Sequence, residues 1–168
     1  MVFLVKDLKR FQPFSEIVNS NDNYSLKTEM ITSKIIKPAS LICKILQLKD
    51  DETAFELRRL RKINGISVSI ETSYIRNLYL PNIDKINFGN NPLYKTIELN
   101  YGRQISYTNE EILIVKATKI EAKLLNVSFG SHLTMIKGTS LDQDNIVLEY
   151  FESVSLPSLY RFISWQRK

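Results

Sequence analysis

Most of the chain alternates between apolar and polar positions with the period of β-strands, and shorter stretches follow the three-to-four spacing of helices. Strand-like runs bounded by turn residues are expected at residues 28–37, 53–62, 67–75, 111–115, 133–141, 146–154 and 160–165. Helical segments are expected within residues 4–17, 38–49, 92–102 and 116–126. Together these elements predict an α+β domain, with an antiparallel β-sheet of about six strands flanked by helices.

No feature of the sequence divides the chain into two domains. Its 168 residues contain no internal repeat, no low-complexity tract and no linker rich in proline or glycine. We therefore expect a single domain over residues 1–168, in which residues 1–27 lead into the first strand of the sheet and residues 81–91 form a loop.

Asn64 and Gly65 separate two of the strand-like runs and predict a β-hairpin turn. The orientation of Glu71 on the second strand depends on the length of this turn, because a one-residue shift in register moves a side chain to the other face of the sheet. A two-residue loop places Glu71 opposite Arg58. A three-residue loop places it opposite Arg59, and the sequence leaves both registers open.

The first strand of this hairpin carries two arginines on its apolar face. Arg59 and Arg61 share that face with Phe55, Leu57 and Ile63. A guanidinium group on a core-facing strand has to be paired or to bind an anion, since an unpaired buried charge costs several kcal/mol. Two such groups, about 7 Å apart on one side of a strand, suit a phosphate or carboxylate ligand. Internal Arg–Glu bridges or a solvated sheet face are the competing interpretation, and on general grounds the more common one.

Glu149 is a second candidate site residue, because it lies between Val147 and Phe151 on one face of its strand. A carboxylate that points inward from this position could bind sugar hydroxyls. The competing interpretation is an ion pair with Arg59 or Arg61.

Composition and charge narrow the classes of function. A hydrophobic content of 43% and a charged content of 24% suit a packed core, and the net charge of +5 is small for a nucleic-acid-binding arm. The basic residues are spread along the chain apart from a cluster at residues 58–62, which favours a small anionic ligand over an extended groove. Cys43 is the single cysteine, and no apolar run approaches the roughly 18 residues of a membrane span. These features predict a cytoplasmic protein with no membrane partner.

Motifs of common enzyme and cofactor sites are missing from the sequence. It has no glycine-rich phosphate loop and no nucleophile elbow, and its single histidine, His132, has no second histidine or cysteine nearby. We therefore expect no enzyme activity, no cofactor and no metal. Several aromatic residues fall at spacings typical of core or hairpin positions rather than of a platform for stacking bases: Phe11, Phe14, Tyr74, Tyr94, Tyr101, Tyr107 and Trp165.

Several short motifs follow one another in an order that is more specific than any one of them. They are Leu57-Arg58-Arg59-Leu60-Arg61, Asn64-Gly65-Ile66-Ser67-Val68, Ile70-Glu71-Thr72-Ser73-Tyr74-Ile75, Leu93-Tyr94, Tyr101-Gly102, Glu121-Ala122-Lys123-Leu124-Leu125, Gly130, Val147-Leu148-Glu149-Tyr150 and Tyr160-Arg161-Phe162. Over nearly its whole length, the chain resembles the UTRA ligand-binding domain of the HutC subfamily of GntR-type transcription regulators.

This resemblance implies a sheet of the chorismate-lyase type that carries an effector pocket, and a symmetric homodimer built through the domain. The effectors of this family are often phosphorylated sugars. By position, the resemblance implies that Arg59 and Arg61 hold the phosphate or another anionic group. It also implies that Glu71 and Glu149 bind hydroxyl groups and that Tyr160 closes the site.

Three further positions bear on the site that the resemblance implies. Ser25 and Thr28 match a stretch that often supplies hydroxyl and amide contacts in this family. Pro92 stands where the family is expected to have a serine. The proline removes both a hydroxyl group and a backbone donor, so the contact to phosphate and the identity of the effector are expected to differ here.

The resemblance implies that DNA is a partner only through an N-terminal winged-helix domain that is absent from this chain, since only residues 1–27 precede the first predicted strand. Effector binding would then shift the relative placement of two DNA-binding domains across a dimer. The alternative function is an enzyme of the chorismate-lyase type, which shares the fold and also places arginine and glutamate around an anion. A direct nucleic-acid binder is the third interpretation and ranks last.

Overall fold

The computed structural model describes residues 2–89 and 91–168, while residues 1 and 90, which fall in the predicted lead-in and the predicted loop 81–91, lie outside the described residues. Within the described part, an antiparallel sheet has the strand order β2-β3-β4-β7-β6-β5. Its six strands are β2 (Leu26–Ile36), β3 (Ala54–Ile63), β4 (Ile66–Arg76), β5 (Ile105–Lys116), β6 (His132–Asp142) and β7 (Val147–Ser155). This arrangement confirms the predicted α+β domain, with an antiparallel sheet of about six strands flanked by helices.

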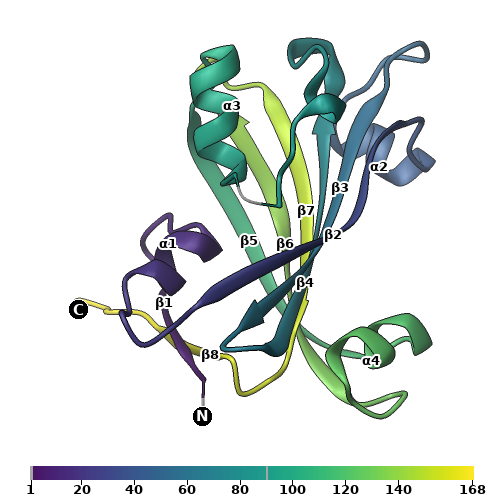
Figure 1. Ribbon diagram of the computed structural model, residues 1–168. Helices are drawn as coiled ribbons and strands as arrows, with labels where there is room; N and C mark the ends of the chain where they lie inside the picture. The colour runs from purple at the N-terminus through teal and green to yellow at the C-terminus, as the bar shows by residue number, and fades with distance from the viewer. Residues whose placement is uncertain (1, 90) are drawn as a thin grey trace.

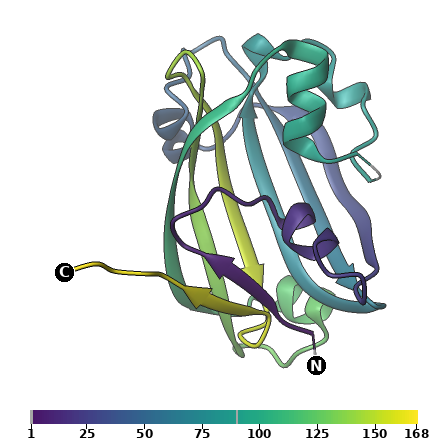
Figure 2. The ribbon, with the colours of Figure 1, turned by 90° about the vertical axis from the view of Figure 1, so that its left-hand side faces the viewer.

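Helices lie on both faces of this sheet (Figure 1). On one face, here called the inner face, lie α1 (Phe14–Asn19) and α3 (Leu93–Tyr101), and on the other lie α2 (Ser40–Ile45) and α4 (Lys119–Leu125). Two 3₁₀ turns, η1 (Asn77–Tyr79) and η2 (Ile83–Lys85), lie between β4 and α3. A parallel pair of short strands, β1 (Leu4–Asp7) and β8 (Tyr160–Ile163), crosses in front of the inner face (Figure 2).

The alternation of side chains along the strands divides the core between the two faces. On the inner face, Phe55 and Leu57 of β3 pack with Leu93 and Ile97 of α3. On the outer face, apolar residues of β3, β4 and β7 pack with α4: Leu60, Ile70, Val154, Ala122 and Leu125. On the inner face, α1 lies at one end of the sheet and α3 at the other. Polar side chains of the sheet face the space between these two helices.

The β3–β4 hairpin has a two-residue turn and nevertheless adopts the register that a three-residue loop would produce. Asn64 and Gly65 have φ of 51° and 81°, the left-handed conformations that a tight hairpin turn of this kind requires. A β-bulge then shifts the register, so that Arg61 pairs with Ser69 and Arg59 pairs with Glu71. Glu71 therefore lies on the same face as the two arginines.

The helix predicted within residues 4–17 is wrong for its first part. Residues 4–7 form β1, in which Leu4 and Lys6 are buried while Val5 is exposed, and the helix begins only at Phe14. The β1 strand forms because it pairs in parallel with β8, whose residues lie more than 150 positions later in the chain. A local pattern cannot reveal such a partner. Because of the same pairing, the strand predicted at 160–165 lies outside the antiparallel sheet, as β8.

Other elements differ from their predicted bounds mainly in length. β5 is an edge strand that begins at Ile105 rather than at residue 111. Its first half is mostly polar and lacks the apolar run on which the prediction of residues 111–115 rested. α2 is shorter than the predicted helix 38–49. α4 follows a capping box formed by Thr118 and Glu121, and α3 ends at Gly102, whose φ of 64° terminates the helix as predicted.

Gly138 of β6 permits a close approach of the neighbouring strand β5, because it has no side chain. A Cβ atom at this position would lie 1.9 Å from the backbone oxygen of Asn109 and 3.1 Å from the ring of Phe151. We expect Gly138→Ala to force the two strands apart and to cost at least about 1–3 kcal/mol, the usual range for overpacking. Thermal unfolding measures this loss. Lys137→Ala, one position away with its side chain on the other face, is the control, and equal stability of the two variants would contradict the close approach.

Candidate ligand-binding site

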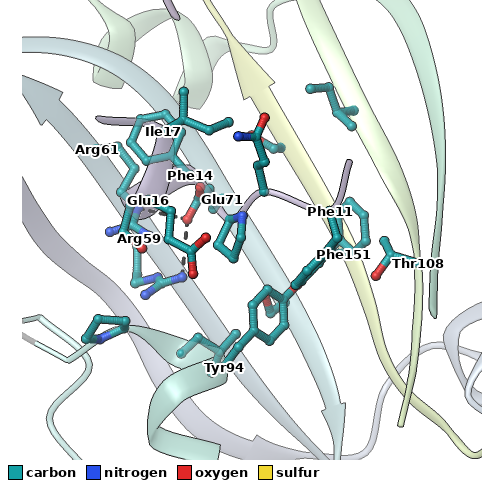
Figure 3. Close-up of a pocket in the computed structure, with 18 of the residues that line it drawn as sticks. Phe11, Phe14, Glu16, Ile17, Arg59, Arg61, Glu71, Tyr94, Thr108 and Phe151 are labelled. Carbon is teal, nitrogen blue, oxygen red and sulfur yellow. Dashed lines mark hydrogen bonds and ion pairs between the residues drawn. The ribbon is translucent and has the colours of Figure 1, made fainter. Parts of the chain in front are cut away.

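The inner face of the sheet holds a cavity of about 360 Å³, a volume in the range of small-molecule sites (Figure 3). Its floor consists of side chains from β3, β4, β7, β6 and β5. The segment from Lys6 to Asn19 contributes more of the lining than any single strand, and the start of α3 forms another wall. The cavity is therefore built from parts of the chain that are far apart in sequence.

At one end of the cavity, Arg59 and Arg61 converge on Glu71 (Figure 3). Arg61 Nε donates to Glu71 Oε2 at 2.8 Å, and Arg59 Nη2 donates to the same oxygen at 3.2 Å. Arg61 Nη1 also donates to Thr28 Oγ1 at 2.6 Å, and its guanidinium group lies over the ring of Phe14. The predicted Arg–Glu bridges are thus present, and they involve two cations for one carboxylate.

Burial and charge act in opposite directions on these three groups. Arg59 and Arg61 are only 4% and 6% exposed. Burial, reinforced by the charge of Arg61, lowers the pKa of Arg59 to about 10 despite the opposing effect of Glu71, so Arg59 stays protonated at neutral pH. Burial alone would raise the pKa of Glu71, but the charges of Arg61 and Arg59 outweigh it and hold that pKa below its ordinary value. Near pH 7, the two guanidinium groups and the one carboxylate therefore leave an excess of positive charge in this cluster.

Arg59 has unused hydrogen-bonding capacity at this end of the cavity. Its Nε and Nη1 atoms are buried and have no hydrogen-bond partner among residues 2–89 and 91–168. An unsatisfied buried donor costs about 1–3 kcal/mol, and more when the group is charged. Because Arg59 lines the cavity, oxygen atoms of an anionic ligand could satisfy both donors.

Glu149 lies farther along the floor and is 2% exposed. Its Oε2 atom accepts hydrogen bonds from Tyr94 at 2.7 Å and from Ser140 at 3.0 Å. Burial raises the pKa of Glu149, although hydrogen bonds from Ser73, Tyr94 and Ser140 oppose the shift. Among the described side chains, no ion pair within 4 Å joins Glu149 to Arg59 or Arg61. The carboxyl group instead links the sheet to α3 through Tyr94.

The structure brings most of the other predicted site residues to the same place. Tyr160 lines the cavity from β8, and burial raises its pKa, so it remains a neutral phenol. Thr28 touches the site through Arg61 without being part of the lining. Ser25 lies outside the lining and instead braces the hairpin turn, where its backbone N–H donates to Asn64 Oδ1 at 2.8 Å. Pro92 does line the cavity, at the start of α3.

Several lining residues were not predicted as site residues. The sequence predicts core or hairpin positions for Phe11, Phe14 and Tyr94, and it gives no site role to Lys6 or Phe151, yet all five line the cavity. The core interpretation is wrong for Phe11, which is 50% exposed, and also for Tyr107 and Trp165, which are 60% and 76% exposed. Phe11 lies in a loop whose path is set by β1 and β8 rather than by local periodicity. No motif at its position could have revealed this role.

His132 is exposed at the first residue of β6. Within the described part of the chain, no group of three or more histidine, cysteine, aspartate or glutamate side chains is placed to hold a metal ion. In the same part of the chain, none of the helices combines the length and the apolar composition that a membrane span requires.

Fold and cavity together define an α+β domain with a cavity of small-molecule size, and comparisons with known proteins place it in a family. The family model described as the UTRA domain matches residues 22–161, so this chain belongs to the UTRA domain family. The resemblance seen in the sequence is thereby confirmed.

Similar proteins with curated descriptions are transcription regulators. The chain is 26% identical over 168 residues to the HTH-type transcriptional regulator TreR of Bacillus subtilis, a match that covers the whole chain and 68% of TreR. It is 25% identical over 138 residues to the HTH-type transcriptional repressor NagR of the same organism, covering 82% of the chain and 56% of NagR. The chain therefore spans only part of the length of each relative.

Solved structures share the fold at low sequence identity. PhnF from Mycobacterium smegmatis superimposes with a TM-score of 0.88 at 17% identity, over 98% of this chain and 72% of PhnF. A GntR-family transcriptional regulator from Enterococcus faecalis V583 matches with a TM-score of 0.71 at 22% identity, over 84% of this chain and 99% of that one. At these identities, the likeness supports the fold alone.

Proposed function

We propose that this chain is the effector-sensing domain of a GntR-type regulator of the HutC subfamily and that it binds a phosphorylated sugar or a similar small anion. The observation that carries the proposal is the state of Arg59. It is a buried cation that lines the cavity, and two of its N–H groups have no partner among the described residues. A ligand with anionic oxygens supplies the acceptors and the negative charge that this group lacks.

The remaining predicted residues fit the binding of a polyhydroxylated ligand. Glu71 orients both guanidinium groups and Glu149 offers carboxyl oxygens to hydroxyl groups, while Tyr160 supplies a phenol from the β8 side. Thr28 acts through Arg61. Pro92 offers neither a hydroxyl nor a backbone N–H at the start of α3, so the anion has to rely on the arginines.

In this proposal, effector binding controls DNA binding through the N-terminal part of the chain. The segment from Lys6 to Asn19 forms a wall of the cavity, so a bound effector touches the part of the chain nearest to an N-terminal winged-helix domain. Differential affinity of the effector for two placements of that segment would shift the population of DNA-binding arrangements in a cytoplasmic homodimer. The effector domain itself performs no reaction and requires no cofactor.

A thermal-shift screen of the purified chain tests this proposal against phosphorylated sugars, amino sugars and small carboxylates. A ligand at 100 times its Kd stabilises the fold by about 2.7 kcal/mol, which raises Tm by about 5–11 °C for a domain of this size. We expect a sugar phosphate to produce such a shift and the corresponding free sugar to produce a smaller one, because only the former carries the anion.

Chorismate in the same screen separates sensing from catalysis. If mass spectrometry of the recovered chorismate reveals a product, the domain is an enzyme of the chorismate-lyase type and the sensor proposal is wrong. If no sugar phosphate raises Tm, the assignment of the anionic ligand is wrong.

A further inference from the structure

The cavity does not end at the arginines. Its lining runs from Arg59 on β3 to Glu110 on β5, across four steps of the sheet order β3-β4-β7-β6-β5. At about 4.8 Å per step, the two strands lie roughly 19 Å apart. A compact inorganic anion held at Arg59 cannot also contact the β5 end, so a ligand that uses the whole cavity has a second group there.

Lys6 provides a second buried charge at the β5 end of the cavity. It lies on β1, its side chain is 7% exposed, and its Nζ atom is 3.1 Å from Glu110 Oε1. An ammonium group carries three N–H donors, and the ion pair with Glu110 is the contact that the described residues give it. Donors of Lys6 and acceptors of Glu110 therefore meet in one place at the cavity lining.

Thr108 adds a hydroxyl group to this end and connects it with the centre. Its Oγ1 atom donates to Ser140 Oγ at 3.3 Å, and Ser140 in turn donates to Glu149 Oε2. The oxygen of Thr108 keeps lone pairs that can accept from a ligand. Figure 3 shows Thr108 on the far side of Phe151 and Phe11 from the arginines.

Aromatic rings line the space between the two polar ends. Phe11 and Tyr94 are in contact, with ring centroids 5.4 Å apart, and Phe151 also lines the cavity. Rings of this kind pack against the apolar faces of a ligand and leave its polar groups to the two ends. The cavity thus has a cationic end, an aromatic middle and a mixed polar end.

We propose that Lys6, Glu110 and Thr108 form a second polar subsite, which binds hydroxyl groups at the end of the ligand opposite its anionic group. A hydroxyl both donates and accepts, and this subsite offers a cationic donor beside an anionic acceptor. The inference rests on the proposed function, since it takes the anion to lie at Arg59 and Arg61. It makes the distance between the two ends a determinant of which ligands bind.

The test compares a short probe with a long one. Glycerol 3-phosphate can reach only the arginine end, whereas lactose 6-phosphate carries many hydroxyl groups beyond its phosphate. Calorimetric or NMR titration gives the two dissociation constants for the unmodified chain and for Lys6→Met and Glu110→Gln. We expect the unmodified chain to favour lactose 6-phosphate, and each variant to reduce that preference by about tenfold or more, because each removes a charged hydrogen-bonding group.

A matched control lies one position from Glu110 on the same strand, β5. Glu111 and Lys137 form a cross-strand ion pair at 3.3 Å on the outer face, so Glu111→Gln is expected to leave both dissociation constants unchanged. If the preference for lactose 6-phosphate survives in Glu110→Gln and in folded Lys6→Met, or is absent from the unmodified chain, the subsite is overturned. Loss of both affinities in Arg59→Ala with no effect at Glu110 would refute the subsite while upholding the anion site. No loss in Arg59→Ala would refute the proposed function itself.

Discussion

Replacing Arg59 with alanine weakens the binding of a sugar phosphate by about 30- to 5,000-fold in our expectation, which corresponds to the roughly 2–5 kcal/mol typical of a buried charged contact. Arg59 lines the cavity, and its Nε and Nη1 atoms have no partner among the described residues, so its removal deletes the donors that the ligand would engage. The domain should remain folded, because Arg61 still neutralises Glu71 at 2.8 Å and the substitution removes a buried charge. Titration calorimetry with the tightest sugar phosphate from the screen measures the loss.

Two further variants separate charge from geometry in this experiment. Arg59→Lys keeps the positive charge but loses the planar fork, so it should fall between the unmodified chain and Arg59→Ala. Arg58→Ala changes the adjacent residue, whose side chain points to the opposite face of β3, and should bind normally. Equal affinity of Arg59→Ala and Arg58→Ala would show that the arginine is purely structural.

Most strands of the sheet could be predicted from local runs of β-prone residues with alternating apolar and polar positions, whereas β5, exposed along most of its length, was predicted only over its second half. The same alternation correctly placed Arg59 and Arg61 on the apolar face of β3, where the structure finds them buried. The register of Glu71 could not be predicted, since a bulge two to three residues beyond the turn decides it. A bulge depends on packing against the neighbouring strands, and Asn64-Gly65 specifies only the turn.

The residues on the walls of the cavity could be predicted less well from the sequence than those on its floor. Phe11 and Lys6 belong to a segment that is positioned by the parallel pairing of β1 with β8. Tyr94 looked like an ordinary helix residue, and its contact with Glu149 joins residues 55 positions apart. Such contacts leave no local periodicity, so single-sequence reasoning finds the groups on the sheet and misses those that close over them.

Replacing Glu71 with glutamine should strongly destabilise the domain at neutral pH. The carboxylate is shared by two arginines that are each less than 8% exposed at the side chain. Breaking a buried ion pair from one side costs about 3–5 kcal/mol, which lowers Tm by about 6–20 °C for a chain of this length. Phosphate should restore more stability to Glu71→Gln than to the unmodified chain, since it can replace the missing negative charge. Glu111→Gln, at an exposed ion pair, should unfold at the normal temperature.

The pH dependence of the same variant identifies the charge as the cause. Because the arginines hold the pKa of Glu71 below its ordinary value of 4.5, the ionised carboxylate stabilises the folded state fully above pH 4.5. This contribution is lost as the pH falls below 4.5 through the folded-state pKa. The difference in Tm between the unmodified chain and Glu71→Gln should therefore be constant near neutrality and shrink on acidification. A difference that stayed constant throughout acid unfolding would mean that glutamine disturbs packing rather than charge.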